Sequence, residues 1–214
     1  MRSALIGLFF LVVAAPPVFS EDQSIRLFNG RDLTGWSIVA DEEGGGAETW
    51  SVSEGVLKST GRPAGYVKTD EEFGDYTLTL EWRWPAGTTS GNSGVLVHAS
   101  TPRAIGVWPK SIEVQLAKDN AGDFWIIGTE LNVPDEQTRK SDRRYRNLTD
   151  DSEKPAGEWN RMEIVCQGDT IRVKVNGDLV NEATNCSVTR GAICLQSEGT
   201  PIEFREIVLT PLAK

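Results

Sequence analysis

Residues 77–84, TLTLEWRW, decide the fold class, because apolar and polar side chains alternate through the whole stretch. Every even-numbered position is Leu or Trp, and every odd-numbered position is Thr, Glu or Arg. Successive side chains of a β-strand point to opposite faces, so this stretch predicts a strand with one buried and one polar face. Shorter alternating stretches recur at 94–98, 111–116, 161–166, 170–175, 192–196 and 203–209.

Turn signals separate these stretches, and helical patterns are missing. Gly168 and the pair Asn176-Gly177 flank residues 169–175, as expected for two hairpins in series. No window shows the i, i+3, i+4, i+7 apolar spacing of the crossover helices that a parallel sheet needs. The sequence therefore predicts an all-β fold, a two-sheet antiparallel sandwich that forms one domain over residues 21–214.

Charge and cysteine content exclude several classes of partner. The chain has 22 Lys and Arg against 31 Asp and Glu, a net charge of −9, which repels nucleic acid and anionic membranes. A single His and the lack of a Cys-x-x-Cys pair argue against a thiolate metal site. Cys166 and Cys186 could form a disulfide in an exported protein, but three buried thiols, with Cys194 the third, are the simpler expectation.

The N-terminus resembles a secretory signal peptide. Arg2 precedes a twelve-residue apolar run, and two prolines and Ser20 follow it. Such a run is short for a membrane span, so we expect residues 1–20 to be removed and the mature protein to be periplasmic or secreted, without a membrane partner. The alternative is an uncleaved anchor or a buried N-terminal strand.

Residues 131–154 interrupt the strand pattern, because they are almost wholly polar. Long connections of this kind are usually functional or disordered. We expect one long loop that covers substrate as a lid, with a plain solvated excursion as the alternative. Its five basic residues are Arg139, Lys140, Arg143, Arg144 and Arg146.

The polar faces of three strands carry the candidate site. If the strands share a sheet, five polar side chains converge on its outer surface: Glu81, Arg83, His98, Glu113 and Gln115. Every sandwich has a solvated outer face, which is the simplest alternative. Nearby Trp108, Trp125 and Asn92 favour carbohydrate, because sugars present hydroxyl edges and apolar ring faces.

A cofactor is not predicted. Asp119, Asn120 and Asp123 are oxygen ligands of the kind that Ca²⁺ accepts, but short loops of Asp and Asn are more often plain turns.

Motifs spread over residues 25–210 resemble those of the 3-keto-disaccharide hydrolase domain family. They occur in the family's order: LFNGRDLTGW at 27–36, WSV at 50–52, GVL at 55–57, GNSGV at 91–95, EVQ at 113–115, GEWN at 157–160, NG at 176–177 and FREI at 204–207. The resemblance implies a concanavalin A-like jelly roll with a sugar site on its concave sheet. Departures from the family pattern are His98, where many members have Arg, and the segment 131–154.

A 3-keto substrate, which the resemblance implies, suggests elimination. The ketone acidifies the C2 proton, so a single base suffices, and Gln115 stands where a retaining glucanase would need a second carboxylate. We expect Glu113 to be the base and His98 the proton donor or ketone polariser.

The other predicted site residues bind substrate. Glu81 and Arg83 are expected to orient it as a pair. Side chains expected to contact sugar hydroxyls and rings are Asn92, Gln115, Trp108, Trp125, Gln196, Glu198 and Arg205. The alternatives to an enzyme are a non-catalytic carbohydrate-binding module and a structural sandwich with an inert patch. Glu113 and His98 facing one cavity would favour the enzyme.

Overall fold

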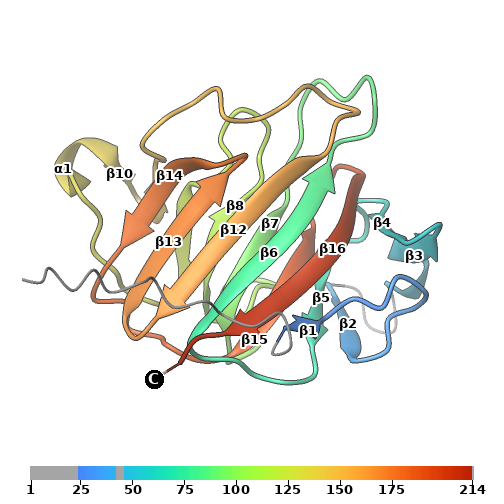
Figure 1. The fold of residues 1–214 in the computed structure, drawn as a ribbon, viewed down its shortest axis with the longest axis horizontal. Coiled ribbons are helices and arrows are strands. Elements are labelled where there is room, and N and C mark those ends of the chain that lie inside the picture. Colours follow the sequence, from blue (N-terminus) through green and yellow to red (C-terminus); the bar gives the residue numbers. More distant parts are fainter. Residues whose placement is uncertain (1–23, 42–45, 214) are drawn as a thin grey trace, which may run out of the picture.

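The computed structural model describes residues 24–41 and 46–213, which form two antiparallel sheets packed face to face (Figure 1). Sheet A runs in the order β14 (Asp178–Ala183), β13 (Thr170–Val175), β12 (Asn160–Gln167), β6 (Tyr76–Arg83), β16 (Ile202–Pro211), β4 (Val56–Ser59) and β3 (Trp50–Ser53), with β1 (Ile25–Arg26) beside β16. Sheet B runs in the order β10 (Lys140–Ser141), β11 (Arg144–Tyr145), β9 (Phe124–Ile127), β8 (Ser111–Gln115), β7 (Gly94–Ala99), β15 (Ala192–Ser197), β5 (Gly65–Thr69) and β2 (Trp36–Ala40). The predicted two-sheet antiparallel sandwich is confirmed, whereas the predicted signal peptide lies outside the described residues.

The core lies between the sheets and follows the alternation that the sequence shows. Leu78, Leu80 and Trp82 of β6 are fully buried, and their neighbours in the core include Val95 of β7 and Ile112 of β8. Burial of each such side chain contributes about 2 kcal/mol. Because these side chains face the core, the side chains that alternate with them point to the outer faces of the two sheets.

The two predicted hairpins are present. Gln167 pairs with Thr170 and Val175 pairs with Asp178, each across a two-residue turn. Asn176 and Gly177 both have positive φ, 51° and 102°, as the mirror-image turns of hairpins require. Cys166, Cys186 and Cys194 are free, buried thiols, and no disulfide joins Cys166 to Cys186.

The segment 131–154 is not the structureless loop that the sequence predicted. It contains a short helix, α1 (Glu136–Arg139), and strands β10 and β11, which extend the edge of sheet B beyond β9. Polar composition hid this structure, because only a few apolar residues of the segment, Leu131, Val133 and Tyr145, pack into the core and buried polar groups hold the rest by hydrogen bonds. No helix of the described residues is both long and apolar enough to cross a membrane.

Arg139 anchors that segment. Its side chain is 7% exposed and donates hydrogen bonds to Pro134 O at 2.7 Å, Arg146 O at 2.8 Å and Asn181 Oδ1 at 2.5 Å. The first two acceptors belong to the segment itself and the third to β14. The segment is therefore fastened to sheet A as well as to the edge of sheet B.

Replacing Arg139 with Met should lower the free energy of unfolding by about 3 kcal/mol, because several buried acceptors lose a charged donor. Urea unfolding of Arg139→Met beside Arg146→Gln, an exposed arginine of the same segment, measures the effect. A loss equal to that of the control would contradict an anchoring role.

Candidate functional site

The outer face of sheet B holds a buried carboxyl group above a glycine. Glu113 lies on β8, between its register partners Leu96 on β7 and Trp125 on β9, and is only 6% exposed. A methyl group at Gly94 would lie 2.8 Å from Glu113 Oε1 and 2.5 Å from Gln196 Oε1. The missing side chain of Gly94 therefore provides the space in which the Glu113 carboxyl and the Gln196 amide meet.

The amide of Gln196 has no protein partner. Gln196 is fully buried, and neither its Nε2 nor its Oε1 makes a hydrogen bond within the described structure. Its backbone carbonyl accepts a 2.9 Å bond from Ser93 Oγ, which holds β15 against the start of β7. An unpaired buried amide costs free energy, so its persistence beside a carboxyl suggests a place for a ligand hydroxyl.

Glu113 is tuned for proton transfer near neutral pH. Burial raises its pKa to about 8, and the negative charge of Glu198 adds to the rise. The Gln196 amide and the Arg143 guanidinium act in the opposite direction. The amide lies near enough to favour the ionised carboxylate, although the two groups do not meet hydrogen-bond geometry. A carboxyl perturbed in this way is typical of catalytic acids and bases.

Glu198 is a second carboxyl group on this face. It follows the end of β15 and is half-buried, and burial raises its pKa while Arg143 lowers it. Glu113 and Glu198 therefore interact as like charges near one cation. Glu198, predicted to bind substrate, therefore lies near enough to Glu113 to act on its charge.

Arg143 is a site residue that the sequence prediction missed. It precedes β11, whose Arg144 is the register partner of Trp125. The guanidinium lies 5.5 Å from the centre of the Trp125 ring and donates a 3.2 Å bond to Ile126 O. The sequence shows a basic segment here but gives no means of choosing one of its five cations. Trp125, expected as a sugar platform, is the ring over which this guanidinium lies.

Three predicted site residues lie on the other sheet. Glu81 and Arg83 belong to β6 and Arg205 to β16, both at the centre of sheet A. They form outer-face ion pairs, Glu81 with Arg205 and Arg83 with Glu203, each at 2.6 Å. The prediction that they share a surface with Glu113 is wrong, because side-chain alternation identifies an outer face but not the sheet to which it belongs.

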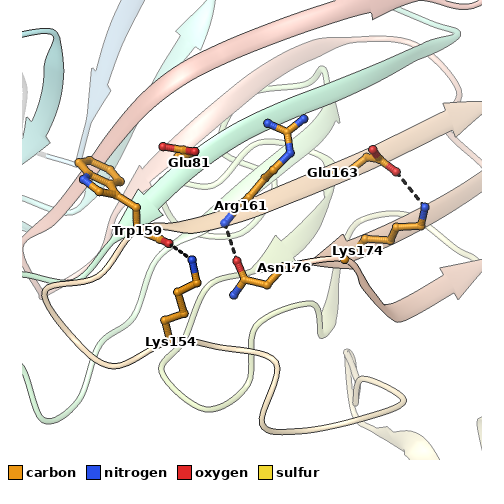
Figure 2. Close-up of a pocket in the computed structure, with 8 residues that line it drawn as sticks. Glu81, Lys154, Trp159, Arg161, Glu163, Lys174 and Asn176 are labelled. Carbon is orange, nitrogen blue, oxygen red and sulfur yellow. Dashed lines mark hydrogen bonds and ion pairs between the residues drawn. The ribbon is translucent and has the colours of Figure 1, made fainter.

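A separate hollow lies on the outer face of sheet A. Its volume is about 520 Å³, and Glu81, Trp159, Arg161 and Lys174 are among its lining residues (Figure 2). Arg161 lies between the carboxylates of Glu81 and Glu163 in this view, and Glu163 pairs with Lys174 at 3.2 Å. Opposite charges alternate across this face, as on many solvated sheets.

His98 faces the core and not Glu113. A β-bulge places an extra residue in β7, where three steps from Leu96 to Ala99 match two steps on β15, and His98 has a φ of 54°. Its ring lies 5.8 Å from that of Tyr76, and its Nδ1 lies 3.1 Å from Val188 O. Burial lowers its pKa. The prediction that His98 and Glu113 share a cavity is wrong, because the bulge reverses the alternation at His98, so this pair does not supply the arrangement that would favour an enzyme.

The remaining predicted residues lie on or near the outer face of sheet B. Gln115 is the register partner of Gly94, but its Oε1 accepts hydrogen bonds from Leu116 N and Ala117 N at 2.9 and 3.0 Å. Asn92 is half-buried just before β7. Trp108 packs near Tyr66, the register partner of Gln196, with ring centres 6.4 Å apart.

The loop considered for Ca²⁺ is occupied by an arginine. Arg144 donates 2.6 Å bonds to Asp123 Oδ2 and Asn120 Oδ1, and Asp119 pairs with Lys118. Over the described ranges, no group of three or more His, Cys, Asp or Glu side chains could hold a metal ion. A guanidinium thus supplies the positive charge that a cation would bring there.

Solved structures of similar shape share the sandwich. A crystal structure described as a glycosyl hydrolase from Parabacteroides distasonis is 22% identical, with a TM-score of 0.67, 92% of this chain covered and 99% of that chain. A Bacillus licheniformis β-glucanase is 16% identical, with a TM-score of 0.54, covering 91% and 100%. A carbohydrate-binding module from Bacillus subtilis is 12% identical, with a TM-score of 0.58, covering 81% and 93%. The fold is a concanavalin A-like jelly roll, as the family resemblance implied.

The chain is thus a jelly-roll sandwich with a buried carboxyl and an unpaired amide on the outer face of one sheet. The chain is a member of the family of 3-keto-alpha-glucoside-1,2-lyase-like domains, whose model matches residues 23–210. The predicted family is therefore confirmed. No curated protein matches the chain.

Replacing Glu113 with Gln should stabilise the protein at alkaline pH. In the unfolded chain the carboxyl ionises near its ordinary pKa of 4.5, but in the folded protein only near 8, so stability decreases as pH rises between these values. The neutral amide avoids this loss. One pKa unit corresponds to about 1.4 kcal/mol, so we expect a gain on the order of 3 kcal/mol at pH 9.

Thermal unfolding at pH 5 and pH 9 measures this gain, with Glu158→Gln, which removes an exposed carboxyl, as the matched control. The stabilisation by Glu113→Gln should be small at pH 5 and large at pH 9. An equal effect at both pH values would show that Glu113 is not held protonated by burial.

Proposed function

We propose that the protein is an exported enzyme that cleaves 3-keto-glycosides, 3-keto-disaccharides included, by elimination followed by hydration. The observation that carries the proposal is the buried carboxyl of Glu113, whose pKa of about 8 suits a base acting near neutral pH. Membership of the 3-keto-alpha-glucoside-1,2-lyase-like family supports the substrate class and an elimination step.

The proposed reaction begins at C2 of the oxidised sugar. Glu113 removes the C2 proton, and the electrons of that bond form an enolate with the C3 oxygen. The enolate then collapses: a C1–C2 double bond forms, the C3 ketone is restored, and the C1–oxygen bond breaks. Water adds across the new double bond, with its oxygen at C1 and a proton at C2, and completes a net hydrolysis.

The leaving oxygen needs a proton, and Glu198 is the proposed donor. The sequence assigned this role to His98, which lies on the inner face of sheet B, next to Tyr76. Glu198 is half-buried on the Glu113 face, and burial raises its pKa, which favours the protonated acid. Retaining hydrolysis is less suited to this face, because Gln115 occupies the next outward position on β8 after Glu113 and binds its own turn.

Export is proposed from the sequence of residues 1–20, with their basic start and apolar run. The periplasmic or extracellular space would also suit a protein that acts on carbohydrate. A non-catalytic sugar-binding module is the second candidate, since the Bacillus subtilis carbohydrate-binding module shares the fold.

The native protein should release product from 3-keto-trehalose or 3-keto-sucrose and not from the unoxidised sugars. Only the ketone makes the C2 proton acidic enough for one carboxylate. The Glu113→Gln variant should lose about 10³-fold in kcat, as expected when a general base is removed. Product release followed by chromatography measures both effects.

Cleavage of the unoxidised sugars would contradict elimination. Binding of the keto sugars by the native protein without turnover would favour the carbohydrate-binding module. Loss of activity in Glu113→Gln with unchanged sugar affinity would place the residue in the chemical step.

Enolate formation does not use the Glu198 proton, so when this step limits the rate, the kcat/KM of the native protein should increase with pH, with a midpoint near 8, because the base must be ionised. Replacing Glu198 with Gln removes a like charge, so it should move this midpoint to lower pH. It should also lower kcat if Glu198 is the proton donor. Glu163→Gln, on the outer face of sheet A, serves as the control and should leave the profile unchanged.

A further inference from the structure

The candidate site contains one cation whose function the elimination leaves unassigned. Arg143 is half-buried on the edge of the Glu113 face, and its guanidinium lies over Trp125, the register partner of Glu113. The stacking fixes where the planar group lies, because an arginine gains most when it faces an aromatic ring. Its position is therefore set by sheet B itself.

The guanidinium retains most of its hydrogen-bonding capacity. A guanidinium has five N–H donors, and the only hydrogen bond of this one within the described structure is that from Nη1 to Ile126 O. Its neighbours are used differently: Arg144 pairs with Asp123 at 2.6 Å, and Arg139 binds three carbonyl oxygens. Arg143 is thus the arginine of this segment with free donors beside Glu113.

Arg143 is the cation of this face that acts on both of its carboxyl groups. Glu113 and Glu198 both respond to the Arg143 charge. When a carboxylate takes up a proton from a neutral substrate, its negative charge moves to the substrate. A cation near the carboxylate can then interact with the negative charge on the substrate while staying almost where it is. Positive charge that is already in place in this way stabilises an anionic intermediate.

We propose that Arg143 binds the C3 oxygen of the 3-keto sugar and stabilises the enolate formed when Glu113 removes the C2 proton. This inference rests on the proposed function. The proton passes from C2 to the Glu113 carboxylate, the electron pair of the C2–H bond moves to the C3 oxygen, and the guanidinium donates hydrogen bonds to that oxygen. No other reactant is needed. Arg143 thus takes the role of ketone polariser for which the sequence suggested His98.

Deuterium exchange isolates this step from bond cleavage. A 3-keto-1,5-anhydroglucitol carries no aglycone at C1, so no glycosidic bond can break and enolate formation appears as replacement of the C2 proton by deuterium in D₂O, followed by NMR. The native protein should catalyse this exchange. The Arg143→Gln variant should be slower by about 10²–10³-fold in kcat, as for loss of one donor to a developing oxyanion.

Two further variants separate this function from a structural role. Arg146→Gln removes an exposed cation from the same segment and should exchange at the native rate. Arg143→Ala should recover part of its exchange rate when guanidinium ion is added at millimolar concentration, whereas a variant that has only lost structure would not. Near-ultraviolet circular dichroism checks that both Arg143 variants are folded.

Native exchange with equal exchange by Arg143→Gln would overturn this inference while leaving Glu113 as the base. Slow exchange by Arg143→Ala without guanidinium rescue, in a folded variant, would also overturn it. No exchange by the native protein, or native-rate exchange by Glu113→Gln, would overturn the proposed function and this inference with it.

Discussion

The lack of a side chain at Gly94 is the constraint on which the arrangement of the site depends. A strand in the middle of a sheet normally covers its outer face with side chains, yet here one position carries only hydrogen. Glu113 and Gln196 both extend into that space from the neighbouring strands β8 and β15. A β-carbon at residue 94 would lie within 3 Å of both side chains, so neither could keep its present position. The carboxyl and the amide meet because Gly94, on the strand between them, has no side chain.

Burial in that space has opposite effects on stability and on chemistry. It raises the pKa of Glu113 to about 8 and so makes the carboxylate a stronger base than a solvated one. The same burial destabilises the folded protein at any pH where the carboxyl ionises. The unpaired amide of Gln196 adds a further cost. Such costs are common where a binding site has been prepared for a ligand that is not yet present.

The sequence alone was sufficient for the fold and for the outward position of Glu113, but not for the groups that surround it. Alternation in TLTLEWRW, at 111–116 and at 192–196 correctly separated inner from outer side chains, and it placed Glu113 and Gln196 outward. The same rule could not distinguish the two outer faces, so Glu81, Arg83 and Arg205 were grouped with Glu113 although they belong to sheet A. The rule also failed at His98, because a β-bulge reverses the alternation there and no residue type in the sequence indicates the bulge. Arg143 was hidden for another reason: its neighbourhood depends on a strand pairing between β9 and β11 that composition does not reveal.

In the proposed reaction one carboxylate, Glu113, acts on the sugar carbons while Glu198 only protonates the leaving oxygen, and the proposed substrate accounts for this division. Ordinary hydrolysis needs one carboxylic acid to protonate the leaving oxygen and one carboxylate to act at C1 as nucleophile or to activate water. A ketone at C3 changes this requirement, since the electron pair released at C2 can rest on the C3 oxygen before the C1–oxygen bond breaks. The protein must then supply a base at C2 and a positive charge at C3, on the same side of the sheet. Glu113 and Arg143 lie on adjoining parts of one outer face, the first on β8 and the second held over Trp125 of β9, the next strand. The segment 131–154 would accordingly matter less as a cover than as the structure that brings this cation to the edge of sheet B.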